Sequence, residues 1–159
     1  MRLGAIRSAL YLSLIIWLLV FSNSMVPIEK GLEKIMLLRP LTNYYFPTFM
    51  LLGLFFPILL RLRRKSDLRS SVGIDSYLIL LISQIVNEII YYNLIGKSIT
   101  VIIGFIFTIA RLFQIAKIKR IQVFRGMHLF FDFQFVLWAI NLITITLNRL
   151  IPLIVDYVY

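Results

Sequence analysis

The chain has 159 residues, of which 60% are hydrophobic, and it carries a formal net charge of +10 at pH 7. A soluble domain is about 45–50% apolar, so this excess would leave large apolar patches in water, a cost that lipid removes. The chain has no cysteine and one histidine, which excludes disulfides and cysteine nucleophiles and leaves little for metal ligation. We therefore predict an integral membrane protein without a metal or other cofactor.

The apolar runs are long enough for helices, and about 20 apolar residues span a bilayer. We predict an all-α fold, a polytopic helical bundle in which residues 1–159 form one membrane domain. Five spans are expected, at residues 9–28, 44–60, 76–95, 98–116 and 129–150. Whether the fifth segment crosses fully is left open, and Pro152 is expected to break the helix before a short apolar tail.

The first apolar run has two interpretations. Arg2 and Arg7 precede it and small residues follow at 22–24, a pattern also typical of a cleaved signal peptide. The run reaches Ile28, which is the length of a span, and we therefore favour a retained helix. Apolar residues then recur with helical spacing after Pro27, which predicts a short interfacial amphipathic helix ending before Pro40.

Basic residues are gathered on alternate connections between these spans. With the N-terminus inside, eleven lie inside and five outside, and Arg111 lies within a span. The positive-inside rule then places the N-terminus inside and the C-terminus outside, in a bacterial inner membrane or an organellar membrane. The predicted basic inner face, which would contact anionic lipid headgroups rather than nucleic acid, includes Arg61, Arg63, Arg64, Lys65, Arg69, Lys117, Lys119, Arg120 and Arg125.

Polar residues form two stripes within the predicted spans. One stripe contains Gln84, Asn87, Glu88 and Tyr91, and the other contains Gln134, Asn141 and Asn148 at seven-residue intervals. We predict that the two stripes face each other or a common cavity. They are either hydrogen-bonding contacts between helices or a polar pathway with Glu88 as a proton or cation site.

The fourth predicted span has three further features. Thr100, Gly104 and Thr108 form a ridge of small residues that permits close helix packing. Arg111 is expected either to extend toward the inner membrane surface or to pair with Asp132 at the start of the next span, and a structural ion pair is favoured over a functional role. The spacing of Arg111, Lys117 and Arg120 also allows a voltage-sensor ladder, although a basic flank is the simpler interpretation.

The single histidine, His128, is expected at the inner membrane interface, where a special role is a weaker interpretation than an ordinary interfacial one. The sequence shows no catalytic grouping, phosphate loop or metal-ligand spacing.

Three short stretches resemble one known family. They are Ser8–Leu12 in the first predicted span, Phe46–Phe49 with Leu59–Arg61 in the second, and Lys119–Ile121 after the fourth. In order and layout they resemble the protein-import channel subunit of the plastid inner envelope and its cyanobacterial relatives, which have four spans. That family's Arg-Phe-Asn…Met-Gln-Ala motif is replaced by Arg69–Gly73, and a fifth span is added, so no functional residue is carried over.

These observations predict a non-enzymatic subunit of a larger membrane assembly, with protein translocation as one role and other membrane subunits as partners. A small transporter or channel built around Glu88 is the first alternative. A membrane enzyme acting on a lipid is the second, with no nucleophile identified.

Overall fold

The computed structural model describes residues 2–21, 47–63, 68–94, 97–121 and 125–158, and every residue in these ranges is helical. The predicted all-α fold is therefore confirmed for this part of the chain. The expected interfacial helix after Pro27 and the small residues at 22–24 lie outside the described residues.

Five helical segments make up the structure. They are α1 (Arg2–Phe21), a helix over residues 47–63 that contains η2 (Leu51–Phe55) and α3 (Phe56–Arg63), α4 (Leu68–Leu94), α5 (Lys97–Ile121), and a last helix formed by α6 (Arg125–Ile145), η3 (Thr146–Leu150) and α7 (Ile151–Val158). The last helix continues through Pro152, which corrects the expected break at this residue.

Three of these helices are long and apolar enough to cross a membrane, at Ser71–Leu94, Ile99–Ile121 and Met127–Val155. They coincide with the third, fourth and fifth predicted spans. At about 1.5 Å per residue, the helix over Met127–Val155 is longer than the roughly 30 Å of hydrocarbon in a typical bilayer. This length fits a helix that tilts or projects beyond the hydrocarbon.

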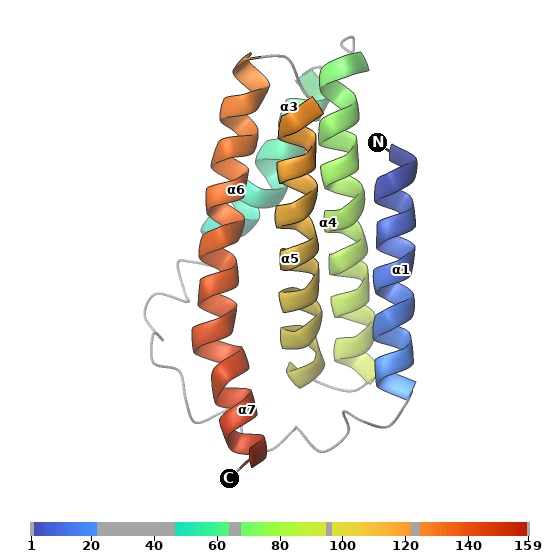
Figure 1. The fold of residues 1–159 in the computed structure, drawn as a ribbon, viewed down its shortest axis with the longest axis vertical. Helices are drawn as coiled ribbons and strands as arrows, with labels where there is room; N and C mark the ends of the chain where they lie inside the picture. The colour runs from blue at the N-terminus through green and yellow to red at the C-terminus, as the bar shows by residue number, and fades with distance from the viewer. Residues whose placement is uncertain (1, 22–46, 64–67, 95–96, 122–124, 159) are drawn as a thin grey trace.

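The long helices lie side by side in the order α1, α4, α5, α6, and the helix over 47–63 crosses behind them (Figure 1). Two packed cores share α4 and α5. One core joins Tyr77 and Ile115 to Phe131 and Trp138 of α6 and to Phe49. The other joins Ile16 of α1 to α4 and α5. Two clusters of buried side chains therefore lie between the described helices.

Both irregular turns of the structure precede a proline. The π-helical turn η2 ends at Phe55, two residues before Pro57, and η3 ends at Leu150, two residues before Pro152. Proline has no N–H, so it cannot donate to the carbonyl four residues earlier, and a π-turn adjusts the helix around the missing bond. Both helices thus pass a proline without ending.

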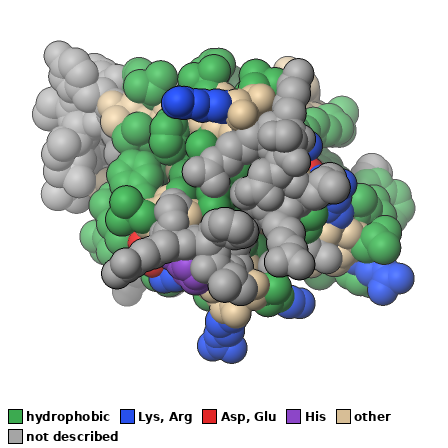
Figure 2. Space-filling model, turned by 90° about the horizontal axis from the view of Figure 1, so that it is seen from above, with side chains coloured by type: hydrophobic (Ala, Val, Ile, Leu, Met, Phe, Trp, Pro, Cys, Tyr) green, Lys and Arg blue, Asp and Glu red, His purple; other side chains and the backbone are tan. Residues whose placement is uncertain are grey.

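Basic residues gather at the end of the bundle where α4 and α6 begin and α3 and α5 end, and α1 begins on the same side (Figure 1). Seen from this end, Lys and Arg side chains lie around the rim of the molecule (Figure 2). We call it the cationic end. The chain finishes at the opposite end, with α7.

The packing predicts that substitutions of two phenylalanines of α5 lower the free energy of unfolding by very different amounts. Phe107 is fully buried, whereas Phe113 is 75% exposed. Phe107→Ala would leave a cavity and lower the free energy of unfolding by about 3–5 kcal/mol, while Phe113→Ala would leave no cavity and change it by less than about 1 kcal/mol. Reversible unfolding in detergent micelles, followed by circular dichroism, measures both values; equal losses would contradict this orientation of α5.

Candidate functional site

A hydrogen-bonded centre joins α4, α6 and η2 inside the larger core. The Trp138 Nε1–H donates to the Tyr77 hydroxyl at 2.8 Å. That hydroxyl lies 2.7 Å from the Gly53 carbonyl and 2.9 Å from Gln134 Oε1, so its one proton can serve either acceptor. The Gln134 Nε2 donates to the Leu52 carbonyl at 2.9 Å. We call these three side chains the Tyr77 centre.

Pro57 explains why the two carbonyls need these donors. The α-helical donor to Gly53 O would be the N–H of residue 57, and a π-helical bond to Leu52 O would use the same group. Proline lacks this N–H, and the Phe56 N–H already bonds to Leu51 O. Because hydrocarbon offers no water to replace the missing bonds, Tyr77 and Gln134 satisfy both carbonyls from neighbouring helices.

Arg111 of α5 lies beside this centre and is completely buried. Its Cζ is 3.8 Å from the centroid of the Trp138 ring and 5.6 Å from that of Tyr77. Its Nε, Nη1 and Nη2 make no hydrogen bond to the described residues. Stacking on a desolvated tryptophan is worth about 2 kcal/mol, which compensates only part of the cost of burying a guanidinium.

Glu88 of α4 is an acidic residue that interacts with Arg111 from a neighbouring helix. It interacts electrostatically with Arg111 and with Arg149, yet no ion pair within 4.0 Å joins it to either among the described residues. Gln84 Nε2 donates to Glu88 Oε1 at 2.7 Å. A Cβ added at Gly104 of α5 would lie 3.4 Å from the same oxygen, so the glycine permits this close approach.

A further polar contact joins α5 to α6 between the levels of Gly104 and Arg111 on α5. Asn141 Nδ2 donates to Thr108 Oγ1 at 3.2 Å. Arg111, Thr108 and Gly104 are spaced by three and four residues and thus share one face of α5. We call the set of Glu88, Gln84, Thr108, Asn141 and Arg111 the polar column; Glu88 is partly exposed and the other four are buried.

The predicted polar stripe of α4 divides between two neighbours. Gln84 and Glu88 belong to the polar column, whereas Asn87 Nδ2 donates to Ser13 Oγ of α1 at 2.8 Å, and Tyr91 packs in the core beside α1. The helix geometry explains this division. Glu88, four residues after Gln84, lies about 40° from it around the helix axis, whereas Asn87, three residues after Gln84, lies about 60° away in the opposite direction. Asn148 of the second stripe is half-buried within η3.

The predicted pair of Arg111 and Asp132 is not formed. Asp132 is half-exposed at the cationic end and pairs with Lys119, while Arg111 faces the core. The ladder proposed for a voltage sensor also separates, since Lys117 faces a groove beside α1 and Arg120 is exposed. Only Arg111 of the ladder lies near Glu88.

At the cationic end, Asp75 forms ion pairs with Arg2 and Arg61. Of the predicted basic inner face, the residues whose side chains are described lie at this end, and Arg63, Lys117 and Arg120 are exposed there. The structure describes Arg69 and Arg125 only as helical backbone, and Arg64 and Lys65 lie outside the described residues. Thr100 lies half-buried near the start of α5, at the opposite end.

Sequence reasoning missed the Tyr77 centre and the acidic partner Asp75. Tyr77 precedes Gln84 by seven residues, so extending the α4 stripe by one heptad would have included it. The effect of Pro57 on the two carbonyls could also have been read from the sequence. No sequence signal shows that Tyr77 and Gln134 are the groups that reach them.

The described residues contain no group of His, Asp and Glu able to hold a metal ion, and His128 lines a small hollow with Lys119 and Arg120. The fold and the site together define a helical membrane protein with a buried charge inside its larger core. No family model, curated protein or solved structure matches the chain.

The carbonyls freed by Pro57 predict a coupling between two substitutions. Tyr77→Phe removes hydrogen bonds to Trp138 and Gly53 and should lower the free energy of unfolding by about 1–2 kcal/mol. Pro57→Ala restores an N–H for the Gly53 carbonyl, so Tyr77→Phe should cost about half as much in that background. A double-mutant cycle on unfolding in micelles measures this coupling, and additive losses would show that Pro57 does not create the need for Tyr77.

Proposed function

We propose that the protein is a non-enzymatic subunit of a larger membrane assembly. The observation that carries this proposal is the packing of the described helices, which lie side by side (Figure 1), onto two clusters of buried side chains. A conducting pathway needs a lumen, and packed side chains occupy the two cores between the described helices. A pathway would therefore form between this chain and further chains, which the broad apolar surfaces of α1 and α6 would contact.

The proposed topology has five spans. Beyond the three long helices, α1 has 20 residues, or about 30 Å, and the helix over 47–63 is near the lower limit for a span. We place the cationic end inside, following the positive-inside rule, with the N-terminus inside and the C-terminus outside. Protein translocation is the role that the resemblance to the import-channel family favours.

Photo-crosslinking from defined surface positions tests the subunit proposal. A benzophenone amino acid would replace Leu10 of α1, Phe113 of α5 or Leu129 of α6, which are 65%, 75% and 74% exposed, with the fully buried Ile103 as the matched control. We expect at least one exposed position to give adducts of fixed mass with another membrane protein in native membranes. Ile103 should give none.

A second measurement makes a negative result informative. Native mass measurement after extraction in mild detergent should show a particle larger than the 18.7 kDa chain. A folded monomer combined with adducts to lipid alone from every exposed position would refute the subunit proposal. The chain has no cysteine, so single cysteines at Arg63 and Asn93, labelled by an impermeant maleimide, report the proposed sides of the membrane in the same preparations.

The polar column favours a second candidate, a small transporter or channel in which Glu88 and Arg111 handle an ion or a charged substrate. A buried ionisable residue within a span is costly and most often functional. Here Arg111 is fully buried without a hydrogen-bond acceptor among the described residues, and Glu88 lies within electrostatic reach. The third interpretation, an enzyme acting on a lipid, gains no support from the described side chains.

Glu88→Gln tests the second candidate because it removes the charge and keeps the shape. In purified, reconstituted vesicles the unmodified protein should carry protons or rubidium ions, and Glu88→Gln should reduce this flux at least ten-fold. Asp132→Asn makes the same chemical change at the half-exposed cationic end and should leave flux unchanged. Absence of flux from the unmodified protein would leave the subunit proposal standing and reject this one.

A further inference from the structure

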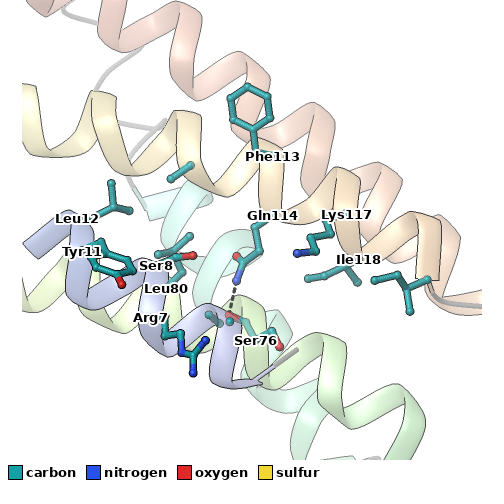
Figure 3. Close-up of a pocket in the computed structure, with 14 residues that line it drawn as sticks. Arg7, Ser8, Tyr11, Leu12, Ser76, Leu80, Phe113, Gln114, Lys117 and Ile118 are labelled. Atoms are coloured by element: carbon teal, nitrogen blue, oxygen red, sulfur yellow. Dashed lines mark hydrogen bonds between the residues drawn. The ribbon is translucent and has the colours of Figure 1, made fainter.

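A groove separates α1 from α5 near the cationic end. It has a volume of about 750 Å³, within the range of about 300–1,000 Å³ typical of small-molecule sites. It forms because α1 packs mainly on α4 and touches α5 only lightly. Figure 3 shows residues of all three helices around it, with Gln114 and Lys117 of α5 facing α1. We call it the α1–α5 groove.

The groove carries positive charge without a matching negative charge. Arg7 of α1 and Lys117 of α5 line it from opposite walls, and no acidic residue lines it. The acidic residue adjacent in sequence to its lining, Asp75, is already paired with Arg2 and Arg61. Within the described part of the chain, neither Arg7 nor Lys117 forms an ion pair. The groove is therefore complementary to an anion.

Along the helix axes, the two cations of the groove lie nearer the cationic end than three apolar residues of its lining. Lys117 lies about 10 Å nearer the cationic end than Ala110 on the same helix, and Arg7 lies about 7 Å nearer than Leu12. Leu12, Leu80 and Ala110 thus line the deeper part, while the cations lie toward the membrane surface. A ligand that fits this gradient has an anionic head and an apolar tail.

A buried acceptor gives a second, independent indication of a ligand. Gln114 lines the groove, and its Nε2 donates to the Ser76 carbonyl at 2.6 Å (Figure 3). Its Oε1 is buried and accepts no hydrogen bond from the described residues. Leaving a buried acceptor unpaired is unfavourable, so a hydroxyl donor in the groove would be stabilised by this oxygen after a small rotation of the side chain.

We propose that the α1–α5 groove binds one anionic glycerophospholipid, whose phosphate lies between Arg7 and Lys117. A hydroxyl of its headgroup or glycerol donates to Gln114, and an acyl chain follows Leu12, Leu80 and Ala110. This goes beyond a general attraction of basic residues to an anionic surface, because it assigns one lipid to one groove. It requires only that the protein lies in a membrane, and it is independent of the subunit proposal.

The test compares two double variants of equal charge in nanodiscs of phosphatidylcholine containing a small fraction of phosphatidylglycerol. Arg7→Gln/Lys117→Gln removes the cations of the groove. Arg63→Gln/Arg120→Gln removes two exposed cations of the same end that do not line it. Native mass spectrometry after release in mild detergent counts the phosphatidylglycerol molecules that each variant retains.

We expect the unmodified protein to retain one phosphatidylglycerol molecule and the groove variant to lose it, with affinity reduced about twenty-five-fold, or about five-fold for each cation. The control variant should retain it. Equal losses in both variants would show that the lipid is held by general surface charge and would overturn the proposal, as would retention by the groove variant. Binding of inorganic phosphate without lipid would identify a simple anion site and likewise overturn it.

A variant of unchanged charge keeps the proposal testable if the groove variant fails to fold. Gly4 lines the groove, and a Cβ built there meets no atom within 4 Å. Gly4→Leu therefore places a larger side chain beside the cations, at a position with open space around its Cβ, and replaces a helix-destabilising glycine. We expect it to reduce phosphatidylglycerol retention at least five-fold, with thermal stability in micelles maintained; full retention would contradict the assigned position of the lipid.

Discussion

Every polar group that the bilayer separates from water has to be satisfied inside the protein, and the larger core follows from this constraint. Pro57 removes the donor for two carbonyls of the helix over 47–63, and side chains from α4 and α6 replace it. These hydrogen bonds fix the height and rotation of three helices relative to one another. Trp138 is the third side chain of the Tyr77 centre, and its ring makes a cation–π contact with Arg111.

The same constraint makes the polar column unfavourable for the stability of the folded protein, because it buries charged and polar groups away from water. Arg111 stacks on the ring of Trp138 and interacts electrostatically with Glu88. Its hydrogen-bond donors nevertheless have no acceptors among the described residues. Burying a charge without hydrogen-bonded partners is unfavourable for stability. For this reason the polar column is the part of the described structure to which the second candidate function is attached.

The long apolar runs predicted the helices of α4, α5 and α6 because length and hydropathy are local properties of a sequence. The position of the basic residues at one end of the bundle also follows from their order along the chain. Partners across helices could not be predicted in the same way. A seven-residue spacing identifies a face but not its neighbour, so Asn87 was grouped with Glu88, although it bonds to Ser13 of α1. For the same reason Asp132 was assigned to Arg111, although Lys119 is its partner.

The two π-turns have a consequence for how the chain tolerates changes in length. Each holds one more residue than an α-helical turn would, and one residue corresponds to about 100° of rotation around the helix axis. Rewinding Leu51–Phe55 as regular α-helix with all its residues kept would rotate Phe49 away from its contact with Trp138, whereas deleting one residue there would restore regular winding and leave Phe49 in phase. At Thr146–Leu150, rewinding without a deletion would likewise rotate Leu153 out of the interior. Each π-turn therefore absorbs one extra residue before a proline, and we expect both helices to tolerate its deletion better than a deletion elsewhere.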